Sequence, residues 1–315
     1  MKYNELGKTG IKVSQLCFGS LTLSPLQKNL SLIKSEQLIK QAYEKGINFI
    51  DTSEYYNNYD KIKAGINGIS NDIVICSKTY AYEAKAARES VEKALRELNR
   101  DYIDIYCLHE QESHLTLKGH AEALIELTKL KEQGKIRAIG ISTHYIAGVL
   151  AACEHPMIDI VQTITNYHGL GIVDGTMPEM LNAIKKLKDM NKAVYGMKPL
   201  GGGNLHRDIV KAFNYVKELS LVDSMAIGLQ NKHELDFAVD YLCNNQYNKE
   251  LLAELTKQQR KLHIASWCTG CGNCIRRCQQ QALTLVDNKA VVDTTKCYLC
   301  GYCSQVCEEF CIKII

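Results

Sequence analysis

The sequence lacks the features that mark several classes of protein. It has no apolar run of the ~20 residues that a membrane-spanning helix needs, and Met1–Glu5 does not resemble a signal peptide. Its formal charge is only +3, which gives no electrostatic footprint for nucleic acid. It has only four prolines and no low-complexity segment. We therefore expect a globular cytoplasmic protein that binds neither a membrane nor nucleic acid.

Cysteine, by contrast, is abundant, and eight of the 14 cysteines repeat one spacing near the end of the chain. Each copy has the pattern Cys-x2-Cys-x2-Cys-x3-Cys. This is the ligand run of bacterial-type ferredoxins with two clusters, in which the fourth cysteine of each run ligates the opposite cluster. We therefore predict two 4Fe–4S clusters. One is held by Cys268, Cys271, Cys274 and Cys307, and the other by Cys297, Cys300, Cys303 and Cys278.

A zinc site and a disulfide framework fit these cysteines less well. A zinc ribbon needs two cysteine pairs and would leave the third and fourth cysteine of each run without a role. A disulfide framework needs an oxidising compartment. We interpret the remaining cysteines as packing residues in a reducing cell interior: Cys17, Cys76, Cys107, Cys153, Cys243 and Cys311.

The residues between the two cysteine runs also resemble bacterial ferredoxins. Ala282–Leu285 and Ala290–Asp293 look like the central strands of that family, joined by a turn at Asp287–Lys289. The proline that usually follows each fourth cysteine is replaced by Gln279 and Glu308. This departure leaves the predicted ligands unchanged.

The chain before the cysteine region alternates short β-branched runs with amphipathic helical patterns. Such alternation over about 230 residues favours a (β/α)8 barrel. A doubly wound sheet would be expected to show a Gly-x-Gly-x-x-Gly turn after its first strand, and Phe18–Leu21 is not one. The predicted strands are Gln15–Phe18, Ile47–Ile50, Ile73–Cys76, Ile103–Leu108, Arg137–Ile141, Asp159–Thr163, Ala193–Met197 and Ser224–Ile227.

Three signals predict helices between these strands. Ser35 can cap a helix that Gly46 ends. Ala87–Leu98 carries an apolar stripe at helical spacing. Pro178 is placed to open another helix, because proline is favoured in the first turn.

The composition changes along the chain and predicts three regions. We expect an α/β TIM barrel over residues 1–243, a helical linker over residues 244–262, and a small α+β ferredoxin-like domain over residues 263–315. The linker is rich in Gln, Asn, Lys and Glu, and the single tryptophan, Trp267, follows it.

Polar residues stand where the predicted strands end, which is where TIM barrels place their function. Asp51 and Tyr56 follow the second strand, Lys78 the third and His109 the fourth. A tyrosine near pKa 10 is a poor acid, but a neighbouring ammonium lowers its pKa, and an aspartate can hold that ammonium in place. A histidine can donate a hydrogen bond to a carbonyl oxygen. Together these residues predict carbonyl reduction.

Each of these residues could instead have an ordinary structural role. Asp51 could cap the next helix, and Lys78 could be a surface lysine. Either residue type occurs often without a catalytic role. Neighbouring candidates for the tyrosine are Tyr55 and Tyr59, and for the histidine His114 and His144.

The motifs around these residues resemble the aldo-keto reductase family. Asn48–Thr52, with Tyr56 five residues after the aspartate, matches its first catalytic motif, and Ile75–Lys78 and Asp104–His109 match the next two. The resemblance covers roughly residues 1–240 and implies a TIM barrel with nicotinamide over its mouth. It also implies that Tyr56 protonates the carbonyl oxygen as hydride reaches the carbon. Two further matches, to the opening hairpin and the fifth strand, are Leu6–Ser14 and Gly134–Ser142.

The resemblance implies a cofactor, NADP(H) or NAD(H). Where the family often has an arginine for the 2′-phosphate of NADP, this chain has Gln230 and Asn231, and a neutral amide gives no charge-assisted pairing with phosphate. FMN held by Gly201–Gly203 is a further option, without a recognisable motif. The cofactor contacts implied by the resemblance are Ser142, Thr143, Gln162, Met197, Lys198, Pro199, Leu200, Gly201, Gly228, Gln230 and Glu234.

Three functions are consistent with a barrel and a cluster domain in one chain. In the first, a nicotinamide-dependent oxidoreductase acts on a small carbonyl or alcohol, and its clusters relay electrons to or from a redox partner protein. In the second, the clusters are purely structural. In the third, the protein is a non-catalytic electron carrier or docking module. We favour the first, because the set of four polar residues is complete.

Overall fold

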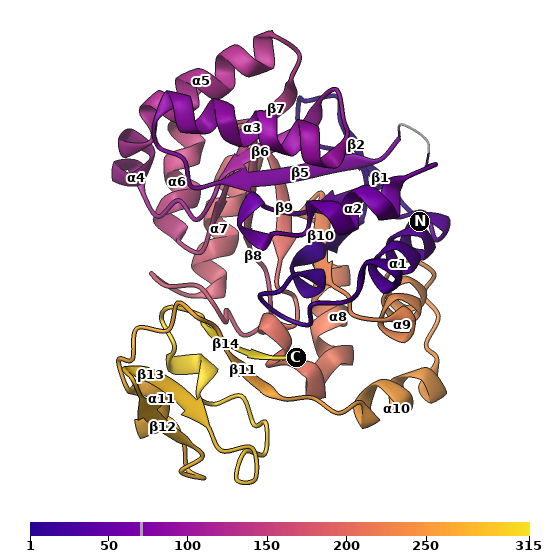
Figure 1. Cartoon of the computed structure of the whole chain (residues 1–315), viewed down its shortest axis with the longest axis vertical. Coiled ribbons are helices and arrows are strands. Elements are labelled where there is room, and N and C mark those ends of the chain that lie inside the picture. The colour runs from indigo at the N-terminus through magenta and orange to yellow at the C-terminus, as the bar shows by residue number, and fades with distance from the viewer. Residues whose placement is uncertain (70–71) are drawn as a thin grey trace.

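The computed structural model describes residues 1–69 and 72–315. Its largest part is a closed barrel of eight parallel strands (Figure 1). These are β3 (Leu16–Gly19), β4 (Phe49–Asp51), β5 (Val74–Thr79), β6 (Ile103–Leu108), β7 (Ile136–Thr143), β8 (Ile160–Ile164), β9 (Ala193–Met197) and β10 (Ser224–Gly228). They follow one another in chain order, and β10 closes the barrel by pairing with both β9 and β3. Each strand coincides, to within a few residues, with a run predicted from the sequence, so the (β/α)8 fold is confirmed.

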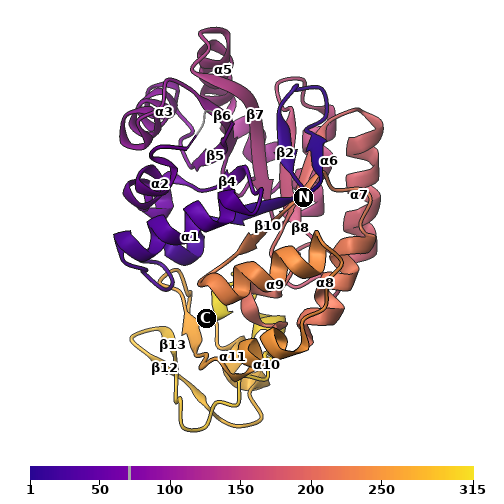
Figure 2. The same cartoon turned by 90° about the vertical axis from the view of Figure 1, so that its right-hand side faces the viewer.

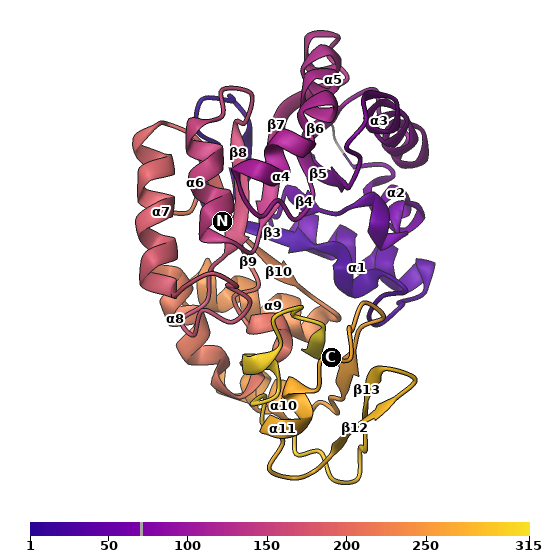
Figure 3. The same cartoon turned by 90° about the vertical axis from the view of Figure 1, so that its left-hand side faces the viewer.

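Helices cover the outside of the barrel (Figures 2 and 3). They are α1 (Leu32–Glu44), α2 (Tyr59–Ile66), α3 (Ala84–Leu98), α4 (His114–Gly119), α5 (Ala121–Glu132), α6 (Ile146–Glu154), α7 (Met177–Asp189), α8 (Ile209–Glu218) and α9 (Lys232–Leu242). Two predicted helix signals are confirmed, because α3 buries the stripe of Ala87–Leu98 and Pro178 lies in the first turn of α7. Within residues 1–69 and 72–315, no helix combines the length and the apolar character that crossing a membrane requires.

The start of α1 differs from the prediction. The N-cap is Ser31, whose Oγ accepts a hydrogen bond from the backbone N–H of Lys34 at 3.4 Å. Ser31 has extended backbone geometry, with φ −60° and ψ 157°, which leaves the first N–H groups of the helix open to capping. Ser35 lies inside the helix and is buried. The predicted end is close to the observed one, since Gly46, at φ +91°, follows the C-cap residue Lys45.

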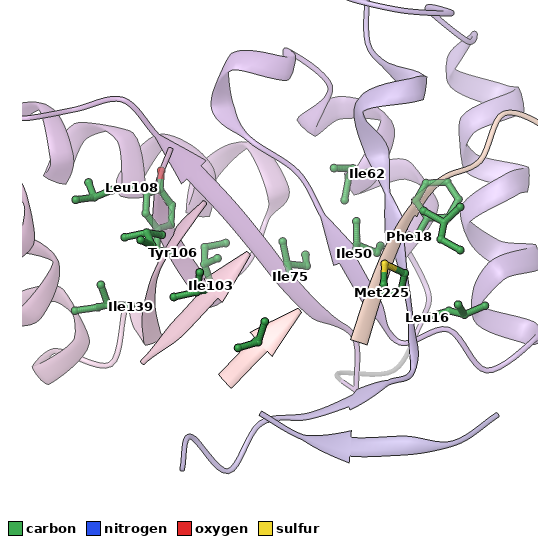
Figure 4. Close-up of a cluster of buried hydrophobic side chains, with 14 of the residues drawn as sticks. Leu16, Phe18, Ile50, Ile62, Ile75, Ile103, Tyr106, Leu108, Ile139 and Met225 are labelled. Carbon is green, nitrogen blue, oxygen red and sulfur yellow. The ribbon is translucent and has the colours of Figure 1, made fainter. Parts of the chain in front are cut away.

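The barrel strands separate two apolar cores, because successive side chains of a strand point to opposite faces. Ile75 packs between barrel and helices, in the core that Figure 4 shows, while Cys76 packs in the barrel interior. The hairpin of β1 (Tyr3–Glu5) and β2 (Lys12–Ser14) adds Ile11 to that interior core. The barrel interior is therefore filled with side chains and is not a channel.

The C-terminal region is a small α+β unit. The chain reaches it through α10 (Lys249–Lys257), and β11 (Leu262–Ile264) then pairs antiparallel with β14 (Ile312–Ile314). Between them lie α11 (Asn273–Arg277) and the hairpin of β12 (Leu283–Val286) and β13 (Lys289–Val292). The hairpin turns at Asp287 and Asn288, both at positive φ, as a tight two-residue turn requires.

The C-terminal unit sits on the barrel beside the carboxyl end of β9 (Figures 1 and 3). Its strand β14 lies against the 3-10 turn Gly201–Gly203, and the Asn204 side chain donates a hydrogen bond to the carbonyl oxygen of Ile312 at 3.2 Å. Arg207 donates another to the carbonyl oxygen of Tyr298 at 2.6 Å. A Cβ atom at Gly203 would overlap the carbonyl oxygen of Ile314. The close approach of the two backbones therefore requires glycine at this position.

Gly203→Ala should loosen the contact between the C-terminal unit and the barrel. Gly203 has φ +87°, so alanine adds backbone strain to the overlap with Ile314. Gly134→Ala is the matched control, because Gly134 has φ +74° with open space around its Cβ position. We expect Gly203→Ala to lower the thermal midpoint more than Gly134→Ala and to speed proteolysis near residues 244–262. Equal effects of the two variants would contradict this account of the docking.

Candidate functional site

Three of the four predicted catalytic residues line one cavity of about 550 Å³ at the carboxyl end of the barrel. Asp51 ends β4, Tyr56 ends the 3-10 turn Glu54–Tyr56, and His109 follows β6. The fourth, Lys78, belongs to β5 and lies behind them. The cavity volume falls in the range of about 300–1,000 Å³ that is usual for small-molecule sites.

A short turn places Tyr56 at the cavity. Ser53 caps it, since its Oγ accepts a hydrogen bond from the backbone N–H of Tyr55 at 3.3 Å. Asn57 ends it in the left-handed conformation, with φ +49°. Asparagine adopts this conformation more readily than most residues, because its short polar side chain can bond locally. The local sequence therefore explains why the tyrosine after the β4 aspartate leaves the surface and faces the cavity.

Asp51 and Lys78 form a buried ion pair. The Nζ of Lys78 lies 2.7 Å from Oδ2 of Asp51 and donates a second hydrogen bond to the carbonyl oxygen of Thr52 at 2.8 Å. The same carboxylate oxygen accepts from Gln162 at 3.1 Å and from Tyr195 at 2.8 Å. Burial is the largest single effect on Lys78 and disfavours the charged amine, but the Asp51 carboxylate together with Tyr56 and Cys76 outweighs it, so the pKa of Lys78 is raised and the amine stays protonated.

Tyr56 lies beside this pair, with the Nζ of Lys78 5.4 Å from the centroid of its ring. The sequence suggests that the ammonium makes the phenol more acidic. In the structure, burial raises the pKa of Tyr56, and the opposing effect of Lys78 is smaller. The side chain is therefore a protonated phenol at neutral pH, which is the form that donates a proton.

His109 completes the group. Its ring centroid lies 5.9 Å from that of Tyr56 and 4.6 Å from that of Tyr80, on which it stacks. Burial lowers its pKa, as do the charges of Lys78 and Lys198, so the imidazole is neutral. Nδ1 lies 3.2 Å from Oγ of Ser53. The single hydroxyl proton of Ser53 has two acceptors within reach, Nδ1 of His109 and the carbonyl oxygen of Lys78 at 3.3 Å. When it goes to Nδ1, Nε2 carries the imidazole proton and can donate to a ligand.

The tyrosines and histidines that the sequence offered as alternatives lie in different parts of the structure. Tyr59 is buried in α2, with its hydroxyl 2.5 Å from Oγ of Ser77, and Tyr55 lies at the cavity. His114 begins α4. His144 lines the cavity, but its Nδ1 lies 2.7 Å from the carbonyl oxygen of Gly171, so Nδ1 carries the proton. Its Nε2 therefore accepts a hydrogen bond, from Nζ of Lys198 at 2.6 Å.

Most of the residues predicted to contact the cofactor line the same cavity. The two that do not are Thr143, whose Oγ1 donates to the carbonyl oxygen of Tyr145 at 3.2 Å, and Gly201, which is buried in the turn beneath β14. Gln162, which donates to Asp51, offers an amide, and Ser142 offers a hydroxyl. Glu234, beside Arg260, offers a carboxylate that can accept from sugar hydroxyls, so the lining groups fit a nicotinamide nucleotide. The lining residues are Ser142, Gln162, Met197, Lys198, Pro199, Leu200, Gly228, Gln230 and Glu234.

Among the cavity residues that were not found from the sequence, four with polar or charged groups come from the linker and the C-terminal unit. Arg260 comes from the linker, and its Nη2 lies 3.2 Å from Oε1 of Glu234. Trp267, Glu309 and Lys313 come from the C-terminal unit. No local motif marks these residues, because they reach the cavity only through the docking of β14. The single signal was the position of Trp267 directly before Cys268.

The eight predicted cluster ligands gather in two groups. Cys278, Cys297, Cys300 and Cys303 line one cavity of about 90 Å³. In the other group, burial raises the pKa of Cys274, and the thiols of Cys307, Cys268 and Cys271 raise it further, so the four lie close together. Both groups have the crossed composition predicted from the spacing. In the described residues, no three His, Cys, Asp or Glu side chains are placed to hold a single metal ion. A cubane spreads its ligands more widely, because each sulfur binds a different iron.

Known proteins resemble both parts of the chain. Residues 15–269 match the family model of the aldo/keto reductases, and residues 260–308 match that of a 4Fe-4S dicluster domain. L-galactose dehydrogenase of Arabidopsis thaliana is 28% identical over 212 residues, which cover 64% of this chain and 66% of that protein. Glyoxal reductase of Bacillus subtilis (strain 168) is 31% identical over 140 residues, which cover 41% of this chain and 49% of that protein. The chain thus spans about half to two thirds of the length of these relatives.

Solved structures agree with the fold. An aldo-keto reductase from Bacillus halodurans, in its holo form, superposes with a TM-score of 0.66 at 19% identity, over 82% of this chain and 96% of that one. At this identity the likeness shows the barrel alone.

Proposed function

The chain belongs to the aldo/keto reductase family and carries a 4Fe–4S dicluster domain, and from these two facts we propose its function. It is a nicotinamide-dependent oxidoreductase that reduces the carbonyl of a small molecule, or oxidises the corresponding alcohol, with Tyr56 as the proton donor. One observation supports this proposal above the others. Asp51, Tyr56 and His109 line one cavity, and Lys78 lies behind them, paired with Asp51 and close to the Tyr56 ring.

The arrangement assigns a role to each side chain. A reduced nicotinamide, when bound, supplies a hydride to the carbonyl carbon. The Tyr56 hydroxyl gives its proton to the carbonyl oxygen, and the charged Lys78 stabilises the phenolate that remains. Asp51 keeps Lys78 protonated and fixed. The Nε2–H of His109 orients the carbonyl oxygen toward Tyr56.

The side chains of Gln230, Glu234 and Arg260 in the cavity lining influence whether NADP(H) or NAD(H) binds. Gln230 lacks the positive charge that favours the 2′-phosphate of NADP, but the cavity also contains Arg260 from the linker. We propose that Arg260 supplies this charge by exchanging Glu234 for the phosphate, since arginine pairs strongly with phosphate. NADPH is then the preferred cofactor. FMN at Gly201–Gly203 is disfavoured, because β14 packs against that turn.

We propose further that the clusters relay electrons between the cavity and a redox partner protein. Trp267 precedes the ligand Cys268, and Glu309 lies two residues after the ligand Cys307. Both residues line the cavity. The cluster of Cys268, Cys271, Cys274 and Cys307 is therefore the one nearer the cavity. Two clusters that each take up one electron can together accept the two electrons of one alcohol oxidation. Because nicotinamide transfers both electrons at once as a hydride, the relay also requires a one-electron adapter, such as a flavin supplied by the redox partner, between the nicotinamide and the nearer cluster.

A relay predicts that the clusters change redox state with the substrate. Under anaerobic conditions and with a flavin present as the adapter, NADPH or the alcohol substrate should bleach the visible absorbance of the clusters, and an electron acceptor should restore it. Cys300→Ala, which removes a ligand of the far cluster, should slow transfer to the acceptor and leave carbonyl reduction by NADPH nearly unchanged. Clusters that stay oxidised through turnover would show instead that they are structural.

The reductase proposal itself is tested by turnover. Anaerobically purified protein should reduce small aldehydes and ketones, beginning with glyoxal, the compound in the name of the Bacillus subtilis relative. NADPH oxidation and alcohol formation should be equal in amount. Failure across a broad set of carbonyls with both nicotinamides, by protein with a full complement of iron and sulfide, would favour the electron-carrier alternative.

A further inference from the structure

Two lysines face the catalytic cavity without an acidic partner. Lys198 follows β9, and Lys313 lies in β14 of the C-terminal unit. The Nζ of Lys198 lies 2.6 Å from Nε2 of His144, and the Nζ of Lys313 donates to the carbonyl oxygen of Phe310. Across residues 1–69 and 72–315, neither ammonium makes an ion pair with a carboxylate. Glu110, an acidic residue of the same cavity, accepts instead from the Tyr80 hydroxyl at 2.7 Å.

The ring of Phe310 brings the two lysines together. The Nζ of Lys198 lies 4.6 Å from its centroid, and the Nζ of Lys313 lies 3.5 Å from it. Cation–π contacts of this kind stabilise an ammonium only in part. Burial lowers the pKa of Lys198 to about 8, and burial together with the charge of Lys198 lowers the pKa of Lys313. Two like charges this close, one of them buried, repel each other, and the negative groups that act on them, Glu110 and Cys307, form an ion pair with neither. An anion between the lysines would remove that repulsion.

The position of the pair indicates which anion. Both lysines line the cavity that holds Tyr56 and His109, and the charge of Lys198 acts on His109 and lowers its pKa, so the lysines lie on the His109 side of the cavity. We infer that Lys198 and Lys313 bind an anionic group, a carboxylate or a phosphate, on the substrate that Tyr56 protonates. This inference rests on the proposed function. The preferred substrates are then oxo acids or phosphorylated carbonyl compounds, and neutral carbonyls are poorer.

Through Lys313, the C-terminal unit contributes to the specificity for anionic substrates. Lys313 reaches the cavity only because β14 packs on the turn Gly201–Gly203. A barrel without the C-terminal unit would keep Tyr56, Lys78 and Lys198 but lose one of the two cations. The anion site therefore belongs to this arrangement of two domains and not to the barrel alone.

The test compares binding of matched ligands to the full chain with its clusters and oxidised nicotinamide in place, so that the carbonyl ligands are not reduced during the titration. Calorimetric titration with pyruvate and with hydroxyacetone contrasts an anionic and a neutral ketone of similar size. Glyceraldehyde 3-phosphate and glyceraldehyde form the corresponding pair for phosphate. We expect the anionic member of at least one pair to bind about tenfold more tightly, because charge-assisted hydrogen bonds are the stronger ones. The pair with the larger ratio identifies the anion as carboxylate or phosphate.

Lys313→Met and Lys198→Met should each reduce this ratio to near one, and Lys313→Arg should keep most of it. Lys185→Met is the control, since Lys185 is an exposed lysine of α7 that pairs with Asp189. If Lys313→Met fails to fold, Lys198→Met gives the same readout from the barrel side. Equal affinities for both members of both pairs in the wild type would overturn the anion site.

Two further outcomes keep the proposals distinct. If the wild type binds the anionic ketone tightly but does not reduce it, the anion site stands and the reductase proposal fails. If the methionine variants weaken NADPH binding but keep the ratio of anionic to neutral ligand, the lysines serve the cofactor's phosphates. That second outcome overturns the inference and leaves the reductase proposal intact.

Discussion

Tyr56→Phe should lower the rate of carbonyl reduction by about 10²–10⁴-fold, the usual contribution of a positioned acid. Phenylalanine keeps the ring beside Lys78 and removes only the hydroxyl whose proton the carbonyl oxygen takes up. We expect little change in stability, because the proposed role of this hydroxyl is to meet the substrate and not to hold the fold together. The measurement is kcat with saturating NADPH, together with an iron count that shows the clusters are retained.

Tyr55→Phe is the matched control, because Tyr55 precedes Tyr56 in the same turn and also lines the cavity. Its ring meets that of Tyr80 edge-on, with centroids 5.8 Å apart, and its hydroxyl is not part of the proposed proton transfer. We expect an effect below about tenfold from this variant, since no general acid is removed. Equal losses from the two variants would mean that the turn as a whole, and not the Tyr56 hydroxyl, supports turnover.

Asp51→Asn should affect both stability and activity. The substitution leaves Lys78 buried without its counter-charge, and breaking a buried ion pair in this way costs about 3–5 kcal/mol. Asparagine keeps the size of the side chain, so the loss reports the charge more than the packing. Activity should also fall, because an uncharged Lys78 cannot stabilise the phenolate of Tyr56. The measurement is the free energy of unfolding from denaturant titration.

The stability of Asp51→Asn should also change with pH, in a direction that follows from the pKa of Lys78. In the wild type, Asp51 raises the pKa of Lys78 above its unfolded value, so the stabilisation is fully present at neutral pH and is lost only in strong alkali. In Asp51→Asn, burial acts on Lys78 without the Asp51 carboxylate to oppose it, so the pKa of Lys78 falls. The stability of the variant should therefore approach that of the wild type as pH rises from about 7 to about 10, near the ordinary pKa of lysine. A constant difference across this range would contradict the proposed role of the ion pair.

Local patterns were sufficient for the barrel and for the grouping of the eight cysteines. Ile103–Leu108 and Ala193–Met197 are strands with the bounds predicted from the sequence, because each is an apolar run whose two faces are both buried. The cysteine spacing predicted which thiols gather, since the fixed reach of a short loop limits the possible pairings. The carboxyl ends of the parallel strands meet at one rim of the barrel. The residues that follow those ends, Asp51, Tyr56 and His109, therefore lie at one cavity.

The features that the sequence did not predict depend mainly on contacts between distant parts of the chain. Lys313 reaches the cavity through the packing of β14 on Gly203, a contact between residues more than a hundred positions apart, so no local pattern marks it. Lys78 alone would lower the pKa of Tyr56. Burial of the Tyr56 side chain has the larger effect and raises this pKa, and that burial depends on the whole fold. Ser31 replaces Ser35 as the helix cap because the backbone before α1 is extended at Ser31.

The central proposal is direct hydride transfer to a carbonyl in the cavity that barrel and cluster domain share. Reduction with NADPH labelled with deuterium at the transferred position, followed by mass spectrometry of the alcohol, tests it directly. We predict that the carbinol carbon carries the deuterium in the wild type and that Tyr56→Phe makes little of this product. An alcohol whose new carbon-bound hydrogen comes from solvent would contradict hydride transfer and point to electrons delivered one at a time through the clusters.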